Sequence, residues 1–200
     1  MKILRTAVVV FLLCFVSGCK WLETISRAIQ GAKGTAEVQF LVMIPVSRIE
    51  GPSGTYQNFD AQRTRKVRDA IMNGIRAAGD RYKPLIYEND KSHSVFYNAV
   101  FGSKEQDTAI TLKAVKRVCA NWVNTVKSQA NCTKCEAILF GWTTQKGENA
   151  TADPYVLNLY DVTTDNWVQI TRSIPFNNDT EFKERLEETA KDLVVKAYQQ

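Results

Sequence analysis

Three cysteines in the middle of the chain are the residues whose type and spacing most directly suggest chemistry. Cys132 and Cys135 form a C-x-x-C pair, and Cys119 precedes them on the apolar face of a predicted helix. A redox pair of the thioredoxin kind lies at a helix N-terminus, where the helix dipole lowers the thiol pKa. Here the pair follows a predicted helix and precedes a predicted strand, which is the wrong position for that chemistry.

Zinc binding is the second chemistry that this spacing permits. A structural zinc site needs four ligands, and only Cys119 and the single histidine, His93, could complete the set. Structural disulfides dominate in exported proteins, so we expect a bridge rather than a metal. The pairing stays open: Cys132 can pair with Cys135, or either can pair with Cys119, and the third cysteine is then a free thiol.

Groups that could support catalysis are few. The sequence contains no G-x-S-x-G, no phosphate-binding glycine loop and no H-E-x-x-H. His93 lies in a serine-rich segment, and Glu148 and Asp153 flank a polar loop, where exposed charges are far commoner than a general acid–base pair. We therefore predict a non-catalytic protein without metal or cofactor. An enzyme would require a ligand-filled cleft lined by perturbed carboxylates or by His93.

The N-terminus has the layout of an export signal. Lys2 and Arg5 precede an unbroken apolar run from Ala7 to Val16, and small residues follow. A basic start, an apolar run of roughly 7–15 residues and small residues at the cut are the marks of a secretory signal peptide. The run is shorter than the ~20 residues that a membrane span needs, so we expect residues 1–18 to be removed.

The residues at the predicted cut, Val16-Ser-Gly-Cys19, resemble a bacterial lipobox. In that motif the thiol receives diacylglycerol and becomes the first residue of the mature chain; Leu is usual at the first position, and Val16 departs from it. The resemblance implies that Cys19 is the lipid attachment site and not a disulfide partner. It also implies that Lys20, not being Asp, sorts the lipoprotein to the periplasmic face of the outer membrane.

Charge and length limit the classes of function. Lys and Arg number 26 against 21 Asp and Glu, and without the two basic residues of the signal the mature part has 24 − 21 = +3. Nucleic-acid-binding domains carry a clustered basic stripe and a pI above about 9, so we expect no nucleic-acid partner. The densest basic run, Arg63 to Arg68, lies in a helical pattern and is interpreted as a solvated helix face. Residues 35–200 suit one globular domain.

Residues 19–34 form a short tether between the lipid and this domain. Four apolar residues at helical spacing suggest an amphipathic helix that docks on the domain, a partner or the membrane surface: Trp21, Leu22, Ile25 and Ile29. The 15 residues from Lys20 to Gly34 span at most roughly 50 Å when extended and roughly 20 Å as a coil. The domain is therefore expected to stay near its membrane.

Periodicity divides the rest of the chain into alternating strands and helices. Strands are predicted over Glu37–Ile49, Pro84–Glu88, Ala137–Trp142, Tyr155–Val162 and Trp167–Ile174, with a hairpin turn over Thr163–Asn166. Helices are predicted from the N-caps Asp60, Ser103 and Asp179, ending near Gly79, Val126 and Tyr198. Lys91–Phe101 is apolar and aromatic and is interpreted as an extra strand or as a loop that packs on a partner.

This order predicts an α/β (α+β two-layer) domain with a mixed sheet and helices packed on it. The stretch AILFGWTT, followed after a polar loop by YVLNLYDVTTDNWVQITRSI and a final amphipathic helix, is similar to the N-terminal domain of the Tol translocation protein. The resemblance covers Glu37 to Tyr198. The same fold occurs in lipoprotein activators of penicillin-binding proteins and in curli-type secretion lipoproteins.

The resemblance implies two functions. One is a non-catalytic interaction or scaffold subunit of a cell-envelope assembly, such as secretion or surface-appendage machinery, which contacts other envelope proteins or copies of itself. Its expected contact surfaces are the apolar residues of the tether, an exposed sheet edge, and the aromatic segment Val95, Phe96 and Tyr97. The other is a regulator of a peptidoglycan synthase. Activators of that kind use a long linker, so the short tether favours the first function.

Overall fold

The apolar stretch predicted over Ala137–Trp142 forms the middle of β5 (Cys135–Thr144), the central strand of a mixed seven-stranded sheet in the computed structural model. β5 pairs antiparallel with β6 (Ala152–Asp161), and β6 pairs antiparallel with β7 (Asn166–Pro175), which confirms the predicted hairpin. The structure describes residues 37–48, 56–87, 90–102, 116–122, 135–144 and 151–199.

The other side of β5 is covered by two short strands. β1 (Val38–Val42) runs parallel to the first half of β5, and β2 (Val46–Arg48) runs parallel to its second half. Beyond them lie β4 (Tyr82–Ile86), parallel to β1, and β3 (Tyr56–Gln57), antiparallel to β2. The parallel β1–β4 pair requires a crossover, and the predicted helix after Asp60 supplies it.

The single strand predicted over Glu37–Ile49 is divided between β1 and β2 by residues 43–45. On the two sides of this break the register with β5 differs by one residue, so that three residues of this chain face two of β5. Pro45 has no N–H to donate to a ladder, which accounts for an interruption within an otherwise apolar run. The backbone at Ile44 therefore lies outside the regular sheet.

Helices α2 (Ala61–Ala77) and α5 (Asp179–Tyr198) pack on one face of the sheet. Asp60 caps α2 as predicted, because its carboxylate accepts a first-turn backbone N–H at 2.8 Å. The cap of α5 is one residue earlier than predicted. Asn178 accepts two backbone N–H groups of the first turn, and Asp179 is the first helical residue.

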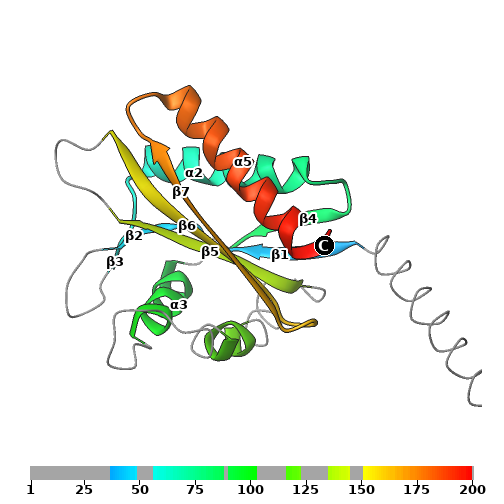
Figure 1. Ribbon diagram of the computed structural model, residues 1–200. Helices are drawn as coiled ribbons and strands as arrows, with labels where there is room; N and C mark the ends of the chain where they lie inside the picture. Colours follow the sequence, from blue (N-terminus) through cyan, green and yellow to red (C-terminus); the bar gives the residue numbers. More distant parts are fainter. Residues whose placement is uncertain are drawn as a thin grey trace, which may run out of the picture. The chain divides into compact units, whose positions relative to one another are not determined.

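Helices cover both faces of the sheet (Figure 1). In β5 the side chains alternate: Ala137 and Leu139 pack toward α2 and α5, whereas Ile138 and Phe140 pack toward α3 (Asp90–Gly102) and the helical residues 116–122. A strand covered on both faces is apolar throughout. The α/β class and the mixed sheet are thus confirmed, and the structure adds a third layer to the two expected.

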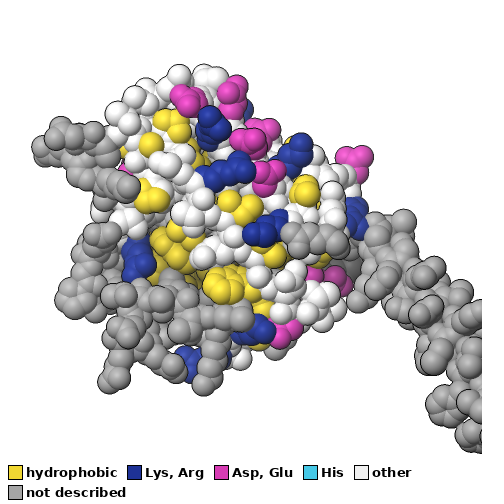
Figure 2. Space-filling view, in the orientation of Figure 1, with side chains coloured by type: hydrophobic (Ala, Val, Ile, Leu, Met, Phe, Trp, Pro, Cys, Tyr) yellow, Lys and Arg dark blue, Asp and Glu magenta, His cyan; other side chains and the backbone are white. Residues whose placement is uncertain are grey.

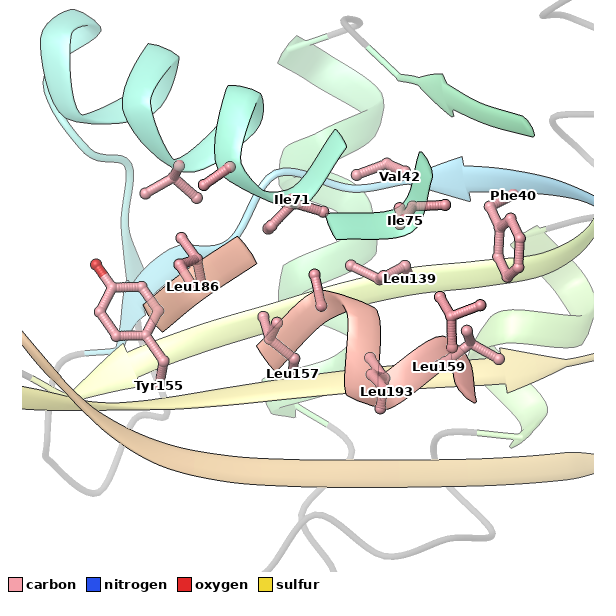
Figure 3. Packing of buried hydrophobic residues seen from close by; sticks show 14 of the residues in the cluster. Phe40, Val42, Ile71, Ile75, Leu139, Tyr155, Leu157, Leu159, Leu186 and Leu193 are labelled. Atoms are coloured by element: carbon pink, nitrogen blue, oxygen red, sulfur yellow. The ribbon is translucent and has the colours of Figure 1, made fainter. Parts of the chain in front are cut away.

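The core between the sheet and the two helices α2 and α5 is shown in Figure 3. It is built from strand side chains and from one face of each helix, including Phe40, Val42, Leu139, Leu157, Leu159, Ile71, Ile75, Leu186 and Leu193. The two helices approach each other closely at Gly74. A Cβ at this position would lie 2.2 Å from the carbonyl oxygen of Glu187 and 2.8 Å from the Cβ of Ala190. Only glycine fits there without separating the helices.

Lys91–Phe101, expected to be a strand or a loop, is helical and forms most of α3. Its aromatic and β-branched composition favours a strand. Four buried side chains nevertheless recur at i, i+1, i+4 and i+5, the pattern of one helix face: Phe96, Tyr97, Val100 and Phe101.

In the described part of the chain, no helix combines the length and the hydropathy needed to cross a membrane.

The turn between β6 and β7 is held by Asp161 at the end of β6. Its carboxylate accepts the backbone N–H groups of Thr163 and Thr164 at 2.8 and 2.9 Å, and the hydroxyl of Tyr198 near the end of α5 at 2.8 Å. One buried carboxylate thereby connects the strand end, the turn and the last helix. This fixes how α5 lies along the hairpin.

Candidate functional site

The residues predicted to anchor and sort the chain lie outside the part that the structure describes. They are Cys19, Lys20 and the four apolar residues of the tether, Trp21, Leu22, Ile25 and Ile29. Cys132 and Glu148 also lie outside it. The roles of all these residues stay predictions.

The aromatic segment of α3, predicted to contact a partner, is only partly at the surface. Val95 is 57% exposed, whereas Phe96 and Tyr97 are completely buried. Phe96 packs against Phe140 of β5 with the ring centroids 5.3 Å apart. The prediction is therefore corrected for Phe96 and Tyr97: both hold α3 on the sheet, and only Val95 is available to a partner.

At the break between β1 and β2, the buried hydroxyl of Tyr97 forms hydrogen bonds with backbone groups that have no strand partner there. It lies 3.0 Å from the carbonyl oxygens of Ile44 and Gly141, to either of which it can donate, and it accepts the Gly141 N–H at 3.2 Å. Buried backbone groups without partners are costly, and here a side chain takes the place of a strand neighbour. Burial raises the pKa of Tyr97 far above its ordinary value, so the hydroxyl keeps its proton.

A cleft of about 250 Å³ opens where the sheet is broken, and we call it the His93 cleft. It lies where the parallel strands β1 and β4 end, between α2 and α3, and the carboxyl ends of parallel strands are where α/β sheets commonly bind ligands. Four segments of the chain contribute its described lining: Ile44 and Pro45 after β1; Asn58, Phe59, Thr64 and Arg68 before and along α2; Ile86 and Tyr87 at the end of β4; and His93 on α3.

Hydrogen bonds position three polar side chains of the His93 cleft. His93 Nε2 lies 2.9 Å from the carbonyl oxygen of Ile44, and because a carbonyl only accepts, Nε2 carries the proton. The Thr64 hydroxyl donates to a main-chain carbonyl before α2 at 3.2 Å. Arg68, one turn after Thr64, donates from Nε to its exposed neighbour Asp69 at 3.1 Å. The cleft thus combines a guanidinium, an oriented imidazole and a hydroxyl.

The cleft joins residues that the sequence presents separately. His93 and the basic run Arg63–Arg68 each attract attention as single features. Asn58 and Tyr87 give no signal of their own, because nothing in their spacing shows that the segments before α2 and after β4 meet. The meeting point becomes visible only once the parallel pairing of β1 and β4 is known.

Asp153, considered above as half of an acid–base pair, belongs to a buried ion pair. Its carboxylate is 3% exposed and accepts from Arg63 Nη2 at 3.0 Å. The same guanidinium donates to the Tyr155 hydroxyl at 2.8 Å and lies 4.8 Å from the ring centroid of Phe59. Burial, partly offset by Arg63, raises the pKa of Tyr155 to about 12. The cluster fastens α2 to β6, which is a structural role.

Of the cysteines in the described residues, Cys119 is a buried free thiol and Cys135 is disulfide-bonded. Cys119 is therefore excluded from the bridge, and the partner of Cys135 lies outside the described residues, so its pairing with Cys132 stays a prediction. Burial raises the pKa of Cys119 above its ordinary range, which keeps the thiol neutral and unreactive. The described residues contain no group of three or more His, Cys, Asp or Glu that could hold a metal ion.

Charges are mixed on the face of the molecule shown in Figure 2, where acidic and basic side chains lie among one another over α5. Arg172 of β7, for example, pairs with Glu188 and Asp192 of α5. Among the described side chains over α5, neither sign of charge forms a separate patch.

No protein-family model matches the chain, and no curated protein matches it. Among solved structures, the chain is similar to a PelC dodecamer from Paraburkholderia phytofirmans, with a TM-score of 0.40 and 12% identity over 82% of this chain and 88% of that one. A point variant of that dodecamer gives 0.40 and 13% over 79% and 88%. The hypothetical protein CT253 from Chlamydia trachomatis gives 0.38 and 7% over 82% and 92%. Likeness at this level shows neither a function nor a partner of this chain.

Proposed function

We propose that this protein is a lipoprotein anchored through Cys19 to the periplasmic face of the outer membrane, where its domain is a non-catalytic interaction subunit of a cell-envelope assembly. The observation that carries the proposal is the short stretch between the lipidation motif and the fold. β1 begins at Val38, 19 residues after Cys19. The start of the sheet therefore stays within roughly 65 Å of the lipid even if the chain between them is fully extended.

Replacing Cys19 with alanine is expected to abolish lipid attachment and to release the protein into the soluble periplasm, because the diacylglycerol is the proposed anchor. Metabolic labelling with a fatty-acid analogue and fractionation of the envelope measure both effects. Lys20→Asp is the matched control: it keeps the acylated thiol and is expected to change only the membrane in which the protein is found. If Cys19→Ala still sediments with membranes, the anchor is not the lipid.

Three strands have a single strand partner within the described residues, namely β3, β4 and β7, and they differ in how they can meet another chain. β3 is only two residues long. β4 is short and carries Lys83 and Pro84, residues that obstruct edge-to-edge pairing. β7 is ten residues long, pairs with β6 without a register shift, and has no second strand partner within the described residues. Its exposed side chains are uncharged: Gln169, Thr171 and Ser173. β7 is the edge that supports strand addition by a partner.

A photocrosslinking amino acid placed at Thr171 in living cells is expected to trap an envelope protein or a second copy of this chain. The same group at Lys83, on the obstructed edge, is the matched control and is expected to give little product. Mass spectrometry identifies what is trapped. Equal products at the two positions would remove β7 as the contact edge. A penicillin-binding protein as the main product would replace the scaffold function with regulation of a peptidoglycan synthase.

A further inference from the structure

The positive charge of the mature chain is concentrated on α2. The 17 residues of this helix contain five basic side chains and one acidic side chain, a net charge of 5 − 1 = +4. The mature chain without the predicted signal has +3, so all residues outside α2 sum to 3 − 4 = −1. One helix therefore accounts for the whole excess of basic residues.

The five basic side chains of α2 divide into two groups. Three form ion pairs within the domain: Arg63 with Asp153, Lys66 with Asp179, and Arg68 with Asp69. The other two, Arg65 and Arg76, are exposed and have no ion pair in the described part of the chain. They are 76 − 65 = 11 positions apart, about three helical turns, so they lie on the same side of the helix. The opposite side of α2 is the buried one.

Helix stability alone does not explain why both of these positions are basic. Arg76 lies in the last turn of α2, where a cation complements the helix dipole. Arg65 lies near the other end, where acidic side chains are favoured, and the first turn of α2 contains no acidic residue. A residue that departs from a local rule without a compensating contact is expected to serve a function.

The C-terminal end of α2 lies beside the point where the tether enters the domain. α2 leads through a short turn into β4. Val38, the first residue of β1, donates its N–H to the carbonyl oxygen of Arg81 in that turn at 2.9 Å and is paired with Tyr82 of β4. Arg76 precedes Arg81 by only five positions. The chain that comes from the proposed lipid thus arrives next to the basic helix.

We infer that the exposed side of α2 binds the anionic surface of the membrane that holds the lipid anchor, with Arg65 and Arg76 in contact with anionic headgroups. The inference rests on the proposed anchoring, because the short tether keeps α2 near the membrane. Each Lys or Arg near an anionic membrane strengthens binding by about fivefold. With the acyl chains as the main anchor, these contacts fix which side of the domain faces the membrane.

The test is sedimentation of the mature chain, residues 19–200, with sucrose-loaded vesicles. Cys19→Ala is introduced so that no acyl chain contributes. Vesicles of phosphatidylcholine are compared with vesicles of equal parts phosphatidylcholine and phosphatidylglycerol, and any affinity of the apolar tether for lipid is common to both. We expect tighter binding to the anionic vesicles at low salt, and a fall toward the neutral level at high salt, because ions screen exposed charges.

Equal binding to the two kinds of vesicle, or a preference for the anionic ones that survives high salt, would overturn the inference. In the first case the basic side of α2 would be left to an acidic protein. The outcome is independent of the anchor itself. Lipid labelling and fractionation of Cys19→Ala test the anchor, whereas the vesicle measurement contains no acyl chain and tests α2 alone.

Two double variants locate the surface. Arg65→Gln/Arg76→Gln is expected to weaken binding to the anionic vesicles by about 10- to 30-fold. Lys183→Gln/Lys191→Gln removes the same charge from exposed positions of α5 and is expected to change binding by less than about threefold, because charges far from the membrane are screened. Circular dichroism verifies that both variants fold. Equal losses in the two variants would show that only the net charge matters, which would contradict the assignment to α2.

Discussion

Replacing Gly74 with alanine is expected to lower the free energy of unfolding by about 2–3 kcal/mol, in the upper part of the range of about 1–3 kcal/mol for overpacking a core. In an isolated helix the same change would stabilise by about 1 kcal/mol, because alanine is the better helix former. At Gly74 the added methyl group meets the Glu187 carbonyl oxygen at 2.2 Å and the Ala190 Cβ at 2.8 Å. The obstacle is mainly backbone, so the helices α2 and α5 must move apart.

Urea unfolding followed by circular dichroism measures this change, and Asn73→Ala is the matched control. Asn73 is the preceding residue on α2 and is only half-buried, so its replacement is expected to change stability by no more than about 0.5 kcal/mol. A Gly74→Ala protein as stable as wild type would show that α2 and α5 are not in close contact. The sign of the effect is therefore the decisive observation.

Replacing Arg63 with methionine is expected to lower the free energy of unfolding by about 3 kcal/mol, near the lower end of the range for breaking a buried ion pair. The variant removes the Arg63 cation from beside the Asp153 carboxylate, which is 3% exposed. The Tyr155 hydroxyl loses its hydrogen bond to the guanidinium at the same time. The lower end applies because the Arg63 side chain itself is 24% exposed and water partly screens it.

The control for Arg63→Met is Lys66→Met on the same helix, which removes an ion pair with Asp179 whose side chains are 34% and 72% exposed. A loss of at most about 1 kcal/mol is expected there. The double variant Arg63→Met/Asp153→Leu is expected to recover much of the stability, because the buried carboxylate is removed together with its cation. If Arg63→Met costs no more than Lys66→Met, the pair does not fasten α2 to β6.

The elements predicted correctly are those whose pattern is decided by neighbours close in sequence. The central strand, the hairpin over β6 and β7, and α5 each carry a clear apolar period, and the turn at Thr163–Asn166 has the polar residues that the structure uses. Asp60 caps α2 because its side chain reaches an N–H only three residues away. Such features need no knowledge of the remaining fold.

The features that the sequence does not predict depend on contacts between distant segments. α3 is a helix because the sheet buries Phe96 and Tyr97, although their composition favours a strand. The break at residues 43–45 is stable because the Tyr97 hydroxyl, more than 50 positions away, bonds to the Ile44 carbonyl. The His93 cleft is a product of the same break. Its lining residues meet only in the folded chain, so no local spacing reveals it.

The placement of β1 beside β5 also has a consequence for the order in which the chain folds. Val42 lies opposite Leu139, a separation of 139 − 42 = 97 positions, whereas β5, β6, β7 and α5 follow one another along the chain. Closing a long loop costs entropy before its contacts form, and such topologies fold slowly. We expect the meander and α5 to form early and β1 to insert late. If the chain is exported N-terminus first, β1, the strand nearest the proposed anchor, leaves the membrane before β5 does. It then pairs with β5 only after the other strands have formed.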